Sequence, residues 1–110
     1  MNRFFSVFLV AGALFASTAH AGYTYDSGRI SLIYAHENGS IAVLLDTGFP
    51  NAVAARQCAT SNGFAGNLTP NSSLKAALFL AKATGSKVTI TTLGCENGGS
   101  WLKILDVYVN

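Results

Sequence analysis

The sequence predicts a small all-β domain that leans towards α+β, with five strands, one helix and one disulfide. Three observations predict it. Runs rich in β-branched and aromatic residues alternate with glycine-containing turns, one segment shows helical periodicity, and two cysteines occur in the chain. A chain of 110 residues is long enough for one domain and no more.

The first 21 residues have the pattern of a secretory signal peptide. Arg3 supplies a positive charge, residues 4–16 form an uncharged apolar run, and Ala19-His20-Ala21 resembles a cleavage site between small residues. The alternative, a buried N-terminal helix, would have no polar face. The apolar run is too short to span a bilayer, and no later segment is apolar enough to do so. We expect a secreted or periplasmic protein without a membrane span, with residues 22–110 as its single domain.

The first half of that domain predicts three strands. We expect a loose arm over residues 22–28, a first strand over residues 29–36 and a second over residues 41–45. Asn38-Gly39 between these strands is typical of a tight hairpin turn, because both central residues of such a turn need positive φ. Residues 53–60 predict a third, weaker strand, although their alanines would suit a helix almost as well.

The second half predicts a helix followed by two strands. After a loop over residues 61–71, a helix begins near Asn71 and ends at Gly85, where a left-handed residue is favoured. Residues 87–92 alternate like a half-buried strand, and residues 101–109 predict a last strand with two apolar faces. One apolar stripe of the helix contains Leu74, Ala77, Leu78 and Ala81.

Three strands, a helix and two more strands form the β-β-β-α-β-β order of the OB-fold, a five-stranded, partly open barrel. Other small α+β folds could use the same order. Cys58 on the third predicted strand and Cys95 at the end of the fourth would tie together the strands that flank the helix. An oxidising compartment favours this disulfide, worth roughly 4 kcal/mol on the chain-entropy model. The alternative is two free buried thiols; they are too far apart in sequence to form a chelate pair for a metal.

The predicted helix is apolar on a second side as well. A surface helix of a small monomer normally has a broader polar face. Either a neighbouring subunit packs against this side, or residues 61–71 fold over it. The predicted interface residues are Ala76, Phe79, Leu80 and Ala83.

Few residues point to catalysis, to a metal or to a cofactor. His36, the only histidine after residue 21, lies in a predicted polar turn. There is no nucleophile elbow and no local carboxylate pair, although Asp46 and Asp106 could meet in space. The formal net charge of +2 comes without a basic cluster, so nucleic acid is not an expected partner. We expect a protein that is not an enzyme and needs no cofactor or metal.

Aromatic residues in the arm, the loops and the turns are the remaining indication of function. Aromatic faces beside hydroxyl and amide groups suit neutral polar ligands such as glycans, because sugars present C–H faces and hydroxyl groups together. Each of these residues could instead belong to the core, Trp101 above all. They are Tyr23, Tyr25, Phe49, Phe64 and Trp101.

The helix and the strand after it resemble one known family. The segment is Leu74-Lys-Ala-Ala-Leu-Phe-Leu-Ala-Lys-Ala-Thr-Gly-Ser-Lys-Val-Thr-Ile90. It is similar to the receptor-binding B subunits of bacterial AB5 toxins of the subtilase-cytotoxin, typhoid and pertussis-like group, in which a helix of similar length ends in Thr-Gly-x-x-Val-x-Ile. A signal peptide, a cysteine before the helix and an OB-like barrel agree as well. Those subunits are usually longer and arrange their cysteines differently.

The resemblance implies a glycan or glycoprotein receptor, a pentamer whose helices line a pore, and a catalytic toxin subunit as partner. In relatives, a Tyr-Ser-rich segment before the first strand contributes to sialoglycan binding, and Tyr25 and Ser27 hold similar positions here. Asp26 between them would repel a sialic acid carboxylate. The alternative function is a monomeric periplasmic accessory or inhibitor protein that binds a protein partner. The predicted ligand-binding residues are Tyr25, Ser27, Phe64 and Trp101.

Overall fold

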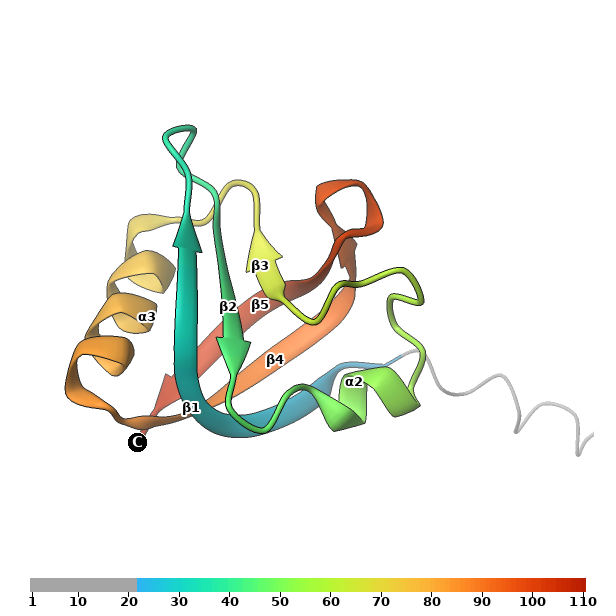
Figure 1. Ribbon diagram of the computed structural model, residues 1–110, viewed down its shortest axis with the longest axis horizontal. Coiled ribbons are helices and arrows are strands. Elements are labelled where there is room, and N and C mark those ends of the chain that lie inside the picture. The colour runs from blue at the N-terminus through green and yellow to red at the C-terminus, as the bar shows by residue number, and fades with distance from the viewer. Residues whose placement is uncertain (1–21) are drawn as a thin grey trace, which may run out of the picture.

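The computed structural model describes residues 22–110 and shows a small, sheet-rich α+β fold with one five-stranded sheet and two helices (Figure 1). The predicted signal peptide lies outside the described residues. The strands are β1 (Thr24–Ala35), β2 (Ile41–Leu45), β3 (Ala65–Asn67), β4 (Lys87–Glu96) and β5 (Trp101–Val109). The helices are α2 (Pro50–Ala54) and α3 (Ser72–Thr84), and a 3₁₀ turn, η1 (Asn97–Gly99), joins β4 to β5.

The strands pair in the order β1-β2-β3-β5-β4, and β4 pairs in turn with β1. All neighbours are antiparallel except β3 and β5, which run parallel. Strand β1 reaches two neighbours because it is 12 residues long. Its residues 24–29 pair with β4 and its residues 30–35 with β2, with an irregular register between Ile30 and Leu32 that bends the strand.

The expected loose arm is wrong, because strand β1 already begins at Thr24. Tyr25, Ser27 and Arg29 face solvent while the residues between them are buried, so the segment has the two-residue period of a strand. The buried position of Asp26 concealed this pattern in the sequence. Its carboxylate accepts hydrogen bonds from the backbone N–H groups of Asn51 (2.8 Å) and Ala52 (3.2 Å), which satisfies the first turn of α2.

The predicted third strand over residues 53–60 is also wrong. Pro50 occupies the first turn of α2, where its fixed φ is favourable, and the alanines that follow favour a helix. Arg56 then takes a left-handed φ of 55° just after the helix. The third strand is instead Ala65–Asn67, inside the predicted loop. A strand of three residues is too short to show periodicity, and its pairing with β2 and β5 defines it.

Helix α3 confirms the predicted helix. The Asn71 side chain accepts a hydrogen bond from the Leu74 N–H, and Gly85 ends the helix with a φ of 67°. Leu78 and Ala81 face the core, and α3 packs against β1 and β5. The largest fully buried hydrophobic side chains are Ile41, Leu78, Ile90, Leu102, Ile104, Val43 and Val88.

The predicted disulfide between Cys58 and Cys95 is confirmed, with Cα atoms 5.1 Å apart. Cys58 lies after α2 rather than on a strand, so the bond ties the connection between α2 and β3 to strand β4. Two hydrogen bonds hold the same connection to the residues that join β4 and β5. The Thr60 hydroxyl donates to the Gly99 carbonyl (2.6 Å), and the Asn62 N–H donates to the Ser100 carbonyl (2.8 Å).

Candidate functional site

Five residues from four segments form a small pocket of about 220 Å³. Two of them, Phe64 and Trp101, are predicted ligand-binding residues. The β1–β2 turn and the β4–β5 connection lie at the same end of the sheet, which brings these segments together (Figure 1). We call this site the aromatic–amide pocket; it is lined by Tyr34 of β1, Asn62 and Phe64 before β3, Asn97 of η1 and Trp101 of β5.

Trp101 is at once a core residue and a wall of the pocket. Only 5% of it is exposed, and its ring meets the Tyr34 ring edge-to-face at 5.9 Å between centroids. Gly66 on β3 makes room for it, since a Cβ at this position would lie 2.5 Å from the indole Cε3 atom. The backbone of β3 therefore fixes the indole that lines the pocket.

The polar groups of the pocket come from two amides and one phenol. The Asn62 side-chain oxygen accepts a hydrogen bond from the Phe64 N–H (3.1 Å), and its amide nitrogen has no hydrogen-bond partner among residues 22–110. Within residues 22–110, the Tyr34 hydroxyl and the Asn97 side-chain amide have no hydrogen-bond partner at all. The pocket thus combines aromatic walls with uncommitted donors and acceptors.

The sequence did not identify Tyr34, Asn62 or Asn97 as site residues. Each asparagine precedes a glycine, and a turn already explains that pair. Tyr34 lies in the strand predicted over residues 29–36, where an aromatic residue is expected for strand propensity alone. One signal was available for these residues. An aromatic residue and two Asn-Gly turns lie near the ends of predicted strands, and those ends could meet at one edge of a sheet.

The structure places Tyr25 and Ser27 together, but away from the pocket. Both lie on the outer surface of β1, where Tyr25 is 52% exposed and Ser27 shares a hydrogen bond of 2.7 Å with the Thr89 hydroxyl. The nine-residue separation of Tyr25 and Tyr34 corresponds to roughly 30 Å of extended strand. The expected repulsion of an acidic sugar by Asp26 is wrong, because Asp26 points into the protein and is only 3% exposed.

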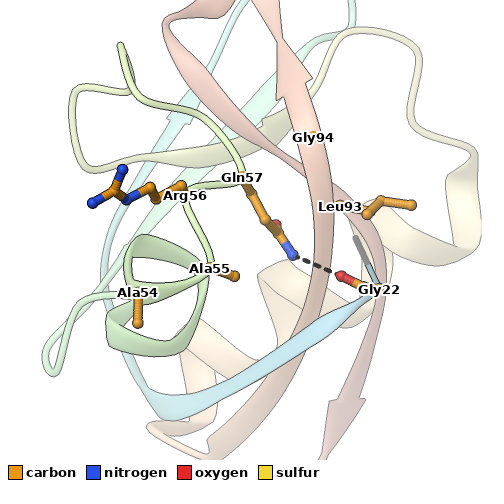
Figure 2. A pocket seen from close by; sticks show the side chains of 7 residues that line it. All are labelled: Gly22, Ala54, Ala55, Arg56, Gln57, Leu93 and Gly94. Carbon is orange, nitrogen blue, oxygen red and sulfur yellow. Dashed lines mark hydrogen bonds between the residues drawn. The ribbon is translucent and has the colours of Figure 1, made fainter. Parts of the chain in front are cut away.

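A larger pocket, of about 480 Å³, lies between the end of α2 and strand β4 (Figure 2). Gln57 crosses it: its amide nitrogen donates to the carbonyls of Gly22 (3.3 Å) and Thr92 (3.0 Å), and its oxygen accepts from the Thr92 hydroxyl (2.9 Å). Arg56, the charged lining residue, points away from Gln57 in Figure 2. The Gln57 amide, which crosses this space, is therefore committed to the protein itself.

The acidic residues considered for catalysis have separate surroundings. Asp46 accepts a hydrogen bond from the Arg29 N–H (2.8 Å), whereas Asp106 lines a groove between α3 and β5. His36 accepts from the Asn38 N–H (3.1 Å) within the β1–β2 turn. Residues 22–110 contain no group of three or more His, Cys, Asp or Glu side chains that could hold a metal ion.

The second apolar side of α3 is open to solvent. Phe79 is 45% exposed and Leu80 is 58% exposed, and Ala76 and Ala83 are exposed as well. Residues 61–71 therefore do not fold over this side. In a single copy of the chain, nothing among residues 22–110 covers it.

Comparison with family models, with curated proteins and with solved structures finds no match to the chain. The resemblance to toxin B subunits consequently stays a prediction from the sequence. Neither helix of the described part is long and apolar enough to cross a membrane.

Proposed function

We propose that this chain is a non-catalytic, exported binding protein, a subunit like those of toxin B pentamers, that recognises glycans or cell-surface receptors carrying them. The aromatic–amide pocket carries the proposal. It places Phe64 and Trp101 beside two side-chain amides and a phenol hydroxyl. Aromatic rings pack against the C–H faces of sugars, while amides and hydroxyls exchange hydrogen bonds with sugar hydroxyl groups.

The strand order supports an OB-fold assignment. In that fold, a helix follows the third strand, and ligands bind near the connections between strands 1 and 2 and between strands 4 and 5. Here α3 follows β3, Tyr34 lies just before the β1–β2 turn, and Asn97 lies in the β4–β5 connection. The pocket thus occupies the region where an OB-fold would present its ligand site.

A glycan array probed with oxidised protein of residues 22–110 tests this function. We expect binding to a defined set of glycans, and about tenfold weaker binding for Asn97→Ala, since one or two hydrogen bonds would be lost. Asn110→Ala, at an exposed position outside the pocket, serves as the matched control and should bind like the parent. A protein that binds neither an array glycan nor a host cell surface would overturn the proposal.

The exposed side of α3 supports the assembly part of the proposal, in which this side contacts a second copy of the chain. Light scattering on a sizing column gives the solution mass. We expect a pentamer, and a smaller species for Leu80→Glu, because a charge would be buried in the contact. A monomer would overturn the assembly. Together with an absence of glycan binding, it would favour the accessory or inhibitor protein instead.

A further inference from the structure

The ligand class of the pocket follows from its lining residues, and this step rests on the proposed function. We propose that the aromatic–amide pocket holds one uncharged sugar residue, a hexose or an N-acetylhexosamine, rather than a sialic acid or another anionic sugar. Three properties of the pocket carry the inference: its size, its lack of charge and its hydrogen-bonding inventory.

The size of the pocket limits the ligand to a single sugar unit. Sites that enclose drug-sized molecules measure about 300–1,000 Å³. The aromatic–amide pocket, at about 220 Å³, is smaller than that range. One ring fits inside, and any further sugars of a glycan extend over the surface outside the pocket.

The lining of the pocket carries no charge. Its five residues are Tyr34, Asn62, Phe64, Asn97 and Trp101, and none of them is an aspartate, glutamate, lysine, arginine or histidine. An anionic sugar would lose water from its carboxylate on entry and meet no cation in return, which is costly. Proteins that select carboxylates typically supply an arginine fork, and none lines this site. His36 contacts Tyr34 at 6.2 Å between ring centroids but does not line the pocket.

The hydrogen-bonding groups match hydroxyls, which both donate and accept. Asn62 offers mainly donors, because the Phe64 N–H already occupies its oxygen. Asn97 offers both a donor and an acceptor, and so does the Tyr34 hydroxyl. A neutral sugar can satisfy this mixed set with adjacent hydroxyl groups, or with the amide of an N-acetyl group. The Phe64 ring remains for the C–H face, while Trp101, only 5% exposed, contributes little open surface to the pocket.

Calorimetric titration with defined probes tests this ligand class. The probes are methyl glycosides of neutral hexoses and N-acetylhexosamines, with a sialylated trisaccharide for comparison. We expect a neutral probe to bind with the same affinity at low and high salt, because no ion pair forms. Asn97→Ala and Asn62→Ala should each weaken that binding about tenfold. Asn110→Ala, at an exposed position outside the pocket, is the matched control, and Ser27→Ala tests the outer surface of β1 as a rival site. Thermal unfolding of each variant shows whether it folds like the parent.

The outcomes separate this inference from the proposed function. Selective, salt-dependent binding of the sialylated probe would overturn the neutral-sugar inference and leave glycan binding intact. Neutral-probe binding that is lost in Ser27→Ala but kept in both asparagine variants would overturn the pocket as the site. Glycan-array binding without affinity for any single-sugar probe would overturn the one-residue limit. An array without any binding would overturn the proposed function itself.

Discussion

The aromatic–amide pocket and the outer surface of β1 both combine aromatic with polar side chains but differ in shape. At the pocket, four segments converge on a space of about 220 Å³. On β1, Tyr25 and Ser27 both face solvent, and Ser27 lies beside Thr89, its register partner on β4. A row on a sheet surface is convex or flat, whereas ligand sites are concave. Residue type therefore predicted a binding site in both regions. Only the pocket, however, is formed by several segments that converge on one space.

The two regions also depend on different interactions. The outer surface of β1 depends on strand alternation, on the β1–β4 pairing, and on hydrogen bonds from the Asn51 amide and the Thr47 hydroxyl to its backbone carbonyls. The pocket needs the disulfide, the contact of Trp101 with Gly66 and the hydrogen bonds of the connection before β3. A perturbation of these tertiary contacts should damage the pocket and spare the outer surface. The experiments below use this difference, from the largest expected effect to the smallest.

Removal of the disulfide should have the largest effect. Replacing Cys58 and Cys95 by serine together should lower the free energy of unfolding by roughly 4 kcal/mol, measured by urea denaturation. Amide NMR signals of Asn62 and Phe64 should shift, because the bond anchors their connection to β4. The Ser27 signal should shift little. Reduction of the parent protein must give the same pattern, and equal shifts in both regions would contradict the comparison.

Gly66→Ala should destabilise the protein by about 1–3 kcal/mol through overpacking. The new methyl would lie 2.5 Å from the Trp101 ring and 2.6 Å from the Ile41 carbonyl oxygen, so the indole must move. Trp101 is the single tryptophan of the chain, and its fluorescence reports that movement directly. Gly22→Ala is the control, since no atom lies within 4 Å of its added Cβ. Unchanged emission in Gly66→Ala would argue against the described contact.

Asp26→Ala should cost about 1–2 kcal/mol, because the first backbone amides of α2 lose the carboxylate that they share. This change tests the inner side of the strand segment that carries Tyr25. The pocket should keep its affinity for the neutral probe, since Asp26 lies outside it. Asp106→Ala, at an exposed position on β5, should change the free energy of unfolding by less than about 0.5 kcal/mol. A similar cost for both variants would contradict the capping role.

Much of the fold follows from local patterns in the sequence. Residues 41–45 and 101–109 form strands as predicted, and the cap at Asn71 and the left-handed Gly85 locate α3. These elements are long or carry their own end signals. The predictions fail where a tertiary contact, rather than the local sequence, determines the secondary structure. An aspartate at a buried strand position, Asp26, is explained only by its hydrogen bonds to α2. The three-residue β3 is defined only by its pairing with β2 and β5.

The candidate site was predictable in part for the same reason. Phe64 and Trp101 stood out as aromatic residues beside turns, and both line the pocket. The asparagines did not, because an Asn-Gly pair is explained by its own turn geometry. Their meeting depends on the connection before β3, which the disulfide holds against β4 and the Asn62–Ser100 hydrogen bond holds against the β4–β5 connection. No local pattern encodes that placement.

Ser27→Ala and Tyr25→Ala should have the smallest effect. Both side chains lie on the outer surface of β1, so each change should alter the free energy of unfolding by no more than about 0.5 kcal/mol. Loss of the Ser27–Thr89 hydroxyl pair costs little, because water replaces the partner at an exposed position. Titration with the neutral probe should give the parent affinity for both variants. A clear loss of affinity would place the ligand on the outer surface of β1. The convergence of four segments at the pocket would then not be what makes a binding site in this protein.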